Sequence, residues 1–184
     1  MEYRKTRIEG VLVMEPRVFG DDRGYFMEAW KKEVFERHAG RVDFVQENES
    51  RSVRGVVRGL HMQLGEWSQA KLVRVTRGRV LDVAVDLRKG SPTFGRHVAV
   101  ELSEENKLQF FIPRGFAHGF AVLSEEAVFT YKVDNAYAPQ AEVSVKWDDP
   151  EIGIEWPFDK SSAVLSAKDM QARPLRELLD VICP

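Results

Sequence analysis

Two of the four histidines stand in surroundings that suit a catalytic pocket. His61 follows Arg58 by three residues, with a glycine between them. Imidazole accepts a proton near neutral pH, and a guanidinium fork binds phosphate in a bidentate manner. His118 lies in residues 112–120, where a proline and a glycine predict a tight turn that aims the ring into a barrel. From spacing alone, a catalytic and a structural role stay equally open for each histidine.

The other two histidines favour a structural interpretation. His38 falls on the apolar side of a predicted helix over residues 28–39. His97 lies in a predicted strand, where we expect it to face solvent or a partner. We expect neither histidine to carry chemistry.

The elements that must position these residues are mostly short strands. Alternating, β-branched segments dominate the chain, and turn residues separate them. Residues 71–88 are the clearest example, because two alternating runs flank an Arg-Gly pair and predict a hairpin. Strands are predicted at residues 11–15, 42–47, 53–60, 71–76, 80–87, 97–102, 109–112, 120–123, 128–133 and 143–147. So many short strands are typical of a β-sandwich or barrel.

Two stretches have helical spacing. Residues 28–39 predict a helix that ends at Gly40, a residue suited to a C-cap. Residues 167–179 have mixed helical spacing and predict a second helix, which is broken at Pro174. Residues 21–24 read as a turn. No repeat, low-complexity tract or linker interrupts the chain, so we expect one domain over residues 1–184.

Composition limits the function classes. The 184 residues are 43% hydrophobic and 30% charged, with a formal net charge of −2. This balance is typical of soluble globular proteins and argues against a surface that wraps nucleic acid. Cys183 is the only cysteine, which excludes an internal disulfide. No signal peptide or membrane-spanning run is visible, so we expect a cytoplasmic protein that does not enter a membrane.

The Pro-x-Gly-x-x-His turn at residues 113–118 resembles the second motif of the cupin superfamily. A more specific resemblance is to the dTDP-4-dehydrorhamnose 3,5-epimerase family. Its segments recur in order over nearly the whole chain, at residues 19–26, 44–48, 58–61, 71–74, 94–95, 112–120, 131–132, 152–157 and 165–169. The resemblance implies an all-β, cupin-type jelly roll (a double-stranded β-helix) with short peripheral helices.

The resemblance implies an isomerase that acts on a 4-keto-6-deoxy sugar carried on thymidine diphosphate, in dTDP-L-rhamnose formation. Inverting C3 and C5, on either side of the ketone, requires a base on one face, an acid on the other and a positive group at the ketone oxygen. His61 is implied as the base, with Asp169 fixing its tautomer. Tyr131 is implied as the acid. Lys71 would stabilise charge on the ketone oxygen, and His118 would share that task or hold the sugar.

The resemblance also implies the rest of the pocket. Arg58 would neutralise the diphosphate, and Glu47 would contribute mainly through its backbone. Further matched positions are Arg23, Glu28, Gln46 and Asn48 at the nucleotide end, Phe19 and Phe26 against the base, and Glu142 and Lys168 elsewhere on the ligand. In the family, part of this pocket comes from a neighbouring subunit, so a homodimer is implied.

Without the resemblance, these residues also have ordinary structural interpretations. Lys71 alternates with valines and is equally well interpreted as an edge-strand charge. Tyr131 favours a core tyrosine, and Asp169 a helix cap. Arg58 and Glu142 favour solvated surface positions. The resemblance reverses these preferences because all five fall on matched positions together.

The chain departs from the family pattern at three places. Met62 stands after the proposed base, where an aromatic residue is usual, and we expect it to keep the packing. Ala136-Tyr137 replaces two adjacent tyrosines, and Val143 follows Glu142 where glycine is common. These changes leave alternatives open: an epimerase that inverts one carbon, a ketoisomerase on a related dTDP sugar, or a non-catalytic cupin that binds a sugar nucleotide.

Many cupins bind a metal through a His-x-His pair, a Glu and the histidine of the second motif. Here Gln63 stands where the second histidine of the pair would be. Two histidines without a suitably placed carboxylate make a poor divalent metal site. We therefore predict neither a catalytic metal nor another cofactor.

Overall fold

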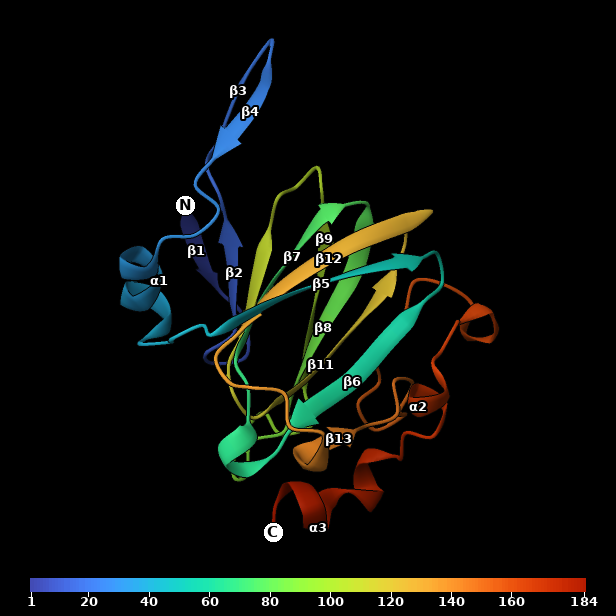
Figure 1. Cartoon of the computed structure of the whole chain (residues 1–184). Coiled ribbons are helices and arrows are strands. Elements are labelled where there is room, and N and C mark those ends of the chain that lie inside the picture. The colour runs from blue at the N-terminus through green and yellow to red at the C-terminus, as the bar shows by residue number, and fades with distance from the viewer.

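The computed structural model describes residues 1–184, and two antiparallel β-sheets that face each other form its body (Figure 1). The larger sheet has six strands, in the spatial order β1 (Glu2–Lys5), β2 (Leu12–Glu15), β10 (Gln109–Ile112), β7 (Lys71–Arg77), β12 (Glu126–Val133) and β5 (Gln46–Val53). The smaller sheet has five, in the order β13 (Glu142–Ser144), β6 (Val57–Gln63), β11 (Phe116–Val122), β8 (Arg79–Asp86) and β9 (His97–Ser103). The predicted all-β jelly roll is confirmed.

The remaining elements are short and lie at the periphery. A two-stranded hairpin of β3 (Val18–Asp21) and β4 (Gly24–Met27) projects away from the body (Figure 1). The helices are α1 (Lys32–Ala39), α2 (Ala167–Met170) and α3 (Leu179–Ile182), with single 3₁₀ turns η1 (Gly65–Trp67), η2 (Pro139–Ala141), η3 (Lys160–Ser162) and η4 (Leu175–Glu177). No helix is long and apolar enough to cross a membrane.

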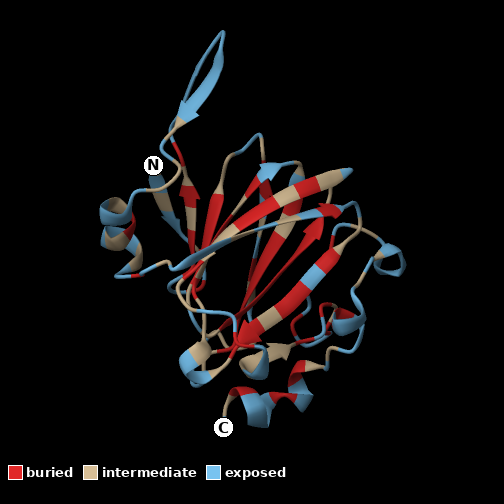
Figure 2. Ribbon diagram, in the orientation of Figure 1, coloured by how far each residue is buried: buried red, intermediate tan, exposed pale blue.

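The main core lies between the two sheets, where the inward residues of both meet. Val73 and Val75 of β7 pack there with Phe110 of β10 and Phe129 of β12, all of them buried. Figure 2 shows red along much of the strands that form this interior. Because strand side chains alternate between faces, Lys71 shares the inward face of β7 with these valines. The predicted alternation of β7 therefore points a lysine into the barrel.

The outer faces of the sheets are partly covered. The C-terminal segment buries Trp147 and Trp156 against the outer face of the five-stranded sheet, and Met62 of β6 packs in the same cluster. This confirms the packing expected of Met62. On the six-stranded sheet, α1 places Phe35 against Phe111, with ring centroids 5.0 Å apart.

Strand bounds differ from the predicted ones where polar residues form an exposed edge. The strand predicted over residues 42–47 is wrong, because β5 begins at Gln46 and continues to Val53. Since β5 is an edge strand with mostly exposed side chains, its sequence lacks apolar alternation. The strand predicted from residue 53 begins instead at Val57, because Gly55 turns the chain with φ at +81°.

Other bounds also move. Strand β11 begins four residues before the predicted start of 120, and β13 ends at Ser144, short of the predicted 147. The pattern does not predict β1, β3 or β4. Helix α1 begins at Lys32 rather than at 28, but it ends as predicted at Gly40, whose N–H donates to the Glu36 carbonyl at 3.0 Å. The tail forms only the short helices α2 and α3.

The two histidines given structural interpretations lie outside the barrel interior. His38 stacks on Tyr3 with ring centroids 4.0 Å apart, as a structural role predicts. His97 does not simply face solvent. It is half-buried, and its Nδ1 lies 3.1 Å from the carbonyl oxygen of Ile152. The ring ties the start of β9 to the C-terminal segment.

Candidate active site

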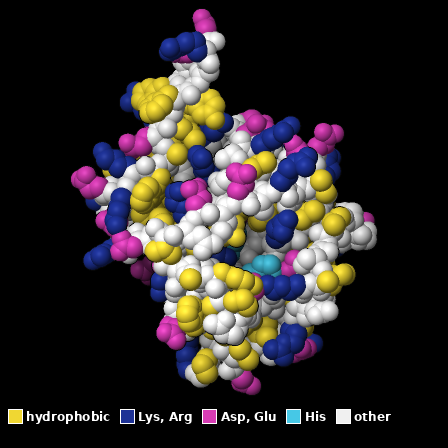
Figure 3. Space-filling view, in the orientation of Figure 1, with side chains coloured by type: hydrophobic (Ala, Val, Ile, Leu, Met, Phe, Trp, Pro, Cys, Tyr) yellow, Lys and Arg dark blue, Asp and Glu magenta, His cyan; other side chains and the backbone are white.

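A cavity opens between the two sheets at the end where β6, β7 and β12 meet. It consists of two adjoining hollows of about 330 Å³ and 320 Å³, which share His61, Lys71 and Tyr131. The first is lined by Gln46, Asn48, His61, Met62, Gln63, Gln69, Lys71, Tyr131, Tyr137 and Glu142. The second adds Glu49, Ser50, Arg58, His118, Phe120, Phe129, Ser166, Lys168 and Asp169. Figure 3 shows histidine atoms at the bottom of this hollow, with basic and acidic side chains around it.

The pairing of β6 with β11 brings His61 and His118 to directly opposite positions. Next to them the ladder is irregular, between His118 and Phe120. Here two glycines cross, and a Cβ on Gly59 would lie 2.5 Å from the Cα of Gly119. Only glycine permits this approach. Gly59 and Gly119 therefore allow the two strands to approach closely enough for both histidine rings to enter one cavity.

His61 is held by a carboxylate from a distant part of the chain. Its Nε2 lies 2.6 Å from Oδ1 of Asp169, which is 4% exposed and belongs to α2. Ser166 caps α2 and donates its hydroxyl to Oδ2 of Asp169 at 2.8 Å. Burial acts to raise the pKa of Asp169, but the hydrogen bonds from His61 and Ser166 outweigh it and lower that pKa. Asp169 therefore stays ionised and accepts the Nε2 proton, which leaves Nδ1 of His61 free as a base.

Lys71 enters the cavity from the opposite sheet. Its edge-strand interpretation is wrong, because β7 is flanked by β10 and β12. Burial lowers the pKa of Lys71 to about 8, although the nearby carboxylates of Asp82 and Glu142 act to raise it. Lys71 is thus a cation near neutral pH, in surroundings that hydrate it poorly. Such a group interacts strongly with an oxygen that gains negative charge.

A second histidine–carboxylate pair lies beside Lys71. Nε2 of His118 is 3.0 Å and 3.1 Å from the two oxygens of Asp82, a residue with no exposed surface. Burial lowers the pKa of His118, although Asp82 acts to raise it. Asp82 is not among the residues expected at the site. The sequence feature that could have indicated it is a lone carboxylate on the inward side of β8, between Val80 and Ala84.

Tyr131 lies on the six-stranded sheet, two strand positions before Val133 and opposite Asn48 of β5. It lines both hollows. Burial raises its pKa, so the phenol keeps its proton at neutral pH. His61 comes from the five-stranded sheet, and Tyr131 comes from the six-stranded sheet. An imidazole and a phenol that keeps its proton therefore line the cavity from its two walls.

Five of the predicted binding residues line the same cavity. Gln46 and Asn48 contact each other at 2.7 Å on the inward side of β5. Arg58 holds its Nε 3.0 Å from the hydroxyl of Ser52 and lines the second hollow. The other two, Glu142 and Lys168, form an ion pair at 2.5 Å. The lining is mixed in charge and rich in hydrogen-bonding groups, and Arg58 and Lys168 are its cations suited to a phosphate.

The other five predicted binding residues do not line this cavity. Glu47 points to the outer face of its sheet and pairs with Lys132 at 2.7 Å. Four others belong to the projecting hairpin or directly follow it. They are Phe19 (51% exposed), Arg23 (side chain 90% exposed), Phe26 (69% exposed) and Glu28, which lines a separate hollow on the outer face of the six-stranded sheet.

The side chains near His61 that could act as metal ligands already have hydrogen-bond partners. Gln63, at the position of a cupin metal ligand, accepts the N–H of Ala138 with Oε1 at 2.7 Å. His61 and His118 each face their own carboxylate. No group of three His, Cys, Asp or Glu side chains converges as metal ligands anywhere in the chain. The side chains present therefore do not form the ligand set that a divalent cation requires.

Comparison with known proteins shows the family to which the chain belongs. A family model described as dTDP-4-dehydrorhamnose 3,5-epimerase matches residues 5–177. The chain belongs to this family. A protein of that name from Salmonella typhimurium is 56% identical over 176 residues, which are 95% of this chain and 96% of the relative. A Streptomyces niveus relative named dTDP-4-dehydrorhamnose 3-epimerase is 39% identical, over 98% of this chain and 86% of its own.

Solved structures of epimerases agree. A Legionella pneumophila 3,5-epimerase, crystallised in complex with dTDP-4-keto-L-rhamnose, matches with a TM-score of 0.94 at 46% identity and covers 100% of this chain and 97% of its own. The fold is thus the cupin-type jelly roll of these epimerases. The matched span contains His61, Lys71, Tyr131 and Asp169, the four residues that the 3,5-epimerase resemblance assigned to catalysis.

Proposed function

We propose that this chain is a dTDP-4-dehydrorhamnose 3,5-epimerase, an isomerase of dTDP-L-rhamnose biosynthesis. It converts dTDP-4-dehydro-6-deoxy-D-glucose to dTDP-4-dehydro-L-rhamnose by inverting C3 and C5. The observation that carries the proposal is the His61–Asp169 pair on one wall of a cavity whose other wall presents Tyr131 and Lys71. The family match supports the same substrate.

The reaction begins with proton removal beside the ketone. Nδ1 of His61 takes the proton from the carbon, and Asp169 stabilises the imidazolium that forms. The electron pair of the broken C–H bond forms a double bond to C4, and the electrons of the carbonyl double bond move onto the ketone oxygen. The product is an enolate with its negative charge on that oxygen. The ammonium of Lys71, with His118 beside it, stabilises that oxygen.

The second half of the reaction returns a proton to the opposite face. The phenol of Tyr131 donates to the carbon, and the enolate collapses to the ketone with inverted configuration. Solvent then restores the proton of Tyr131 and removes the one on His61. Because C3 and C5 both flank the same carbonyl, the same groups act at each carbon in turn.

Incubation with dTDP-4-keto-6-deoxyglucose in deuterated water tests this function. Each inversion removes a carbon-bound proton and returns one from solvent, so deuterium at both C3 and C5 is expected. Deuterium at only one carbon would instead support a single-site epimerase, the alternative favoured by the 3-epimerase name of the Streptomyces niveus relative. No deuterium at either carbon, with the sugar nucleotide still bound, would support a non-catalytic binding protein.

We also propose that two copies assemble so that each projecting hairpin completes the cavity of the other. The hairpin exposes Phe19, Tyr25 and Phe26 to solvent. Figure 3 shows hydrophobic side chains in yellow on this projection. Exposed aromatic residues on a projecting arm are typical of an interface. In this arrangement Arg23, Phe19 and Phe26 reach the nucleotide end of the partner's pocket.

Mixing two inactive variants tests the shared pocket. His61→Asn disables one cavity, and a Phe19→Ser/Phe26→Ser variant disables the hairpin that the partner needs. After joint refolding, we expect about a quarter of wild-type activity, because half of the dimers are hybrid and each hybrid has one intact site. No recovery from the mixture, or a monomeric wild type in light scattering, would refute the exchange of hairpins.

A further inference from the structure

One wall of the cavity is a segment with little regular structure. Residues 134–141, here called the strap, join β12 to β13 and bring Tyr137 to the edge of the first hollow. Only two backbone–backbone hydrogen bonds tie the strap to the facing loop, residues 64–70. They join Leu64 to Ala141 at 2.9 Å and Asp134 to Ala70 at 3.3 Å. Side chains must supply the rest of the attachment.

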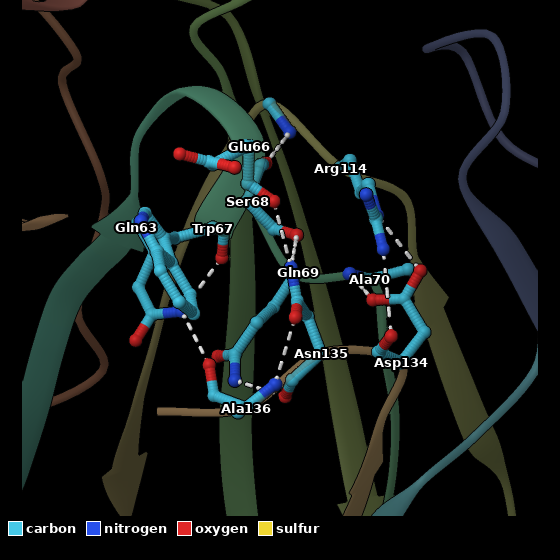
Figure 4. A network of polar contacts seen from close by, with 11 residues as sticks. Gln63, Glu66, Trp67, Ser68, Gln69, Ala70, Arg114, Asp134, Asn135 and Ala136 are labelled. Carbon is cyan, nitrogen blue, oxygen red and sulfur yellow. Dashed lines mark hydrogen bonds and ion pairs between the residues drawn. The ribbon is translucent and has the colours of Figure 1, made fainter. Parts of the chain in front are cut away.

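Gln63 supplies the centre of that attachment, although it lies on β6 and is 5% exposed. Its Nε2 donates to the carbonyl oxygens of Trp67 at 2.6 Å and Ala136 at 3.1 Å, and its Oε1 accepts the N–H of Ala138 at 2.7 Å. Figure 4 shows the amide between the loop and the strap. Both N–H groups and the oxygen of the amide are used, so no smaller or charged side chain reproduces this set.

Two further amides support the same contact. Gln69 donates to the carbonyl of Asn135 at 2.8 Å, and Asn135 donates to the carbonyl of Glu66 at 2.8 Å (Figure 4). These bonds hold the start of the strap, whereas Gln63 holds the residues on both sides of Tyr137. The position of Tyr137 therefore depends on Gln63 more directly than on Gln69.

Tyr137 in turn holds a residue of the ligand-binding wall. Its hydroxyl donates to Oε2 of Glu142 at 2.7 Å, and Lys168 pairs with the same oxygen at 2.5 Å. A displaced strap would free Glu142 and Lys168 to adopt other rotamers. His61 and Gln63 share the inward face of β6. This one strand therefore positions both the proposed base and, through Gln63, the strap.

We infer that Gln63 is a positioning residue for sugar-nucleotide binding, which it serves by clamping the strap that carries Tyr137. The inference rests on the proposed function for the identity of the ligand. It assigns no proton transfer to Gln63, because no polar atom of its amide is free to reach the substrate. Its loss therefore weakens binding and spares the chemical step.

The test variant is Gln63→Glu, which keeps the shape and the acceptor but loses both donors and sets a carboxylate against two carbonyl oxygens. We expect KM, and the Kd of thymidine diphosphate measured by calorimetry, to rise roughly 10-fold, the effect of one or two lost hydrogen bonds. We expect kcat to stay within about threefold. Hydrogen–deuterium exchange should quicken in peptides from residues 134–141 and not in those from β8.

Asn106→Asp is the matched control, because Asn106 also caps a loop with its amide, donating to the carbonyl of Glu101 at 2.9 Å, and does not line the cavity. We expect no change in KM from it. If Gln63→Glu does not fold, Gln69→Leu loosens the same strap and should raise KM in the same direction. A lowered kcat at unchanged KM, or unchanged exchange over residues 134–141, would overturn the inference. The exchange result stands even if the wild type shows no epimerase activity, so the two proposals fail separately.

Discussion

Lys71 is expected to set the alkaline limit of catalysis, because the stabilisation of the ketone oxygen that we propose for its ammonium requires the charged form. Burial lowers the pKa of Lys71 to about 8, although Asp82 and Glu142 act in the opposite direction. A lysine is charged below its pKa, so raising the pH through 8 removes the cation. The charged fraction falls from about 90% at pH 7 to about 10% at pH 9 for such a group. We therefore expect kcat/KM to fall about tenfold between these pH values.

Two other groups in the cavity do not account for such a fall. Burial raises the pKa of Tyr131 above its usual value near 10, so the phenol keeps its proton throughout this range. Burial lowers the pKa of His118 below its usual value near 6.5, so its titration is centred at a pH below this range. We therefore assign the alkaline limb to Lys71.

The assay is solvent deuterium incorporation into the sugar nucleotide, measured as kcat/KM from pH 6 to pH 10. The decisive variant is Lys71→Arg, because a guanidinium stays charged over the whole range. We expect this variant to be slower at pH 7 but to lose the fall between pH 7 and pH 9. An unchanged alkaline limb in Lys71→Arg would refute the assignment of the limb to Lys71.

Three further predictions follow from contacts at the site. Asp169→Asn should lower kcat by about 10²–10⁴-fold, because the amide no longer stabilises the imidazolium of His61; a kcat near that of the wild type would contradict this. Asp82→Asn should move the alkaline limb of kcat/KM to lower pH, because it removes a charge that raises the pKa of Lys71; a limb at higher pH than in the wild type would contradict this. Gly119→Ala should lower the free energy of unfolding by about 1–3 kcal/mol, because its Cβ would lie 2.7 Å from the carbonyl oxygen of Arg58; urea denaturation with an unchanged midpoint would count against that clash.

The strands with inward apolar alternation could be predicted from the sequence. The strand over 109–112 has the predicted bounds, and β7 presents Lys71 inward with its valines, as the pattern indicates. The edge strand β5 could not be predicted, because its side chains are mostly exposed and polar. Periodicity reports burial, so an unburied strand leaves no periodic signal.

The site was harder to predict than the fold, because its members come from distant segments. Spacing left His61 with two equally open roles, and only the resemblance linked it to Asp169, 108 residues away. The structure places the two side chains in contact. Asp82 is a residue that the sequence could indicate, because a carboxylate between inward apolar residues is a recognisable signal. The role proposed for the hairpin could not follow from the sequence pattern, because Phe19 and Phe26 are exposed and do not line the cavity of the chain that carries them.

The proposed mechanism depends most on His61 as the base that removes the protons beside the ketone. The direct test is the rate of deuterium incorporation by His61→Asn, measured in the folded variant at C3 and at C5 separately. We predict a loss of about 10²–10⁴-fold at both carbons, the usual contribution of a general base. Incorporation at the wild-type rate at either carbon would contradict the assignment of His61 as the base for that carbon.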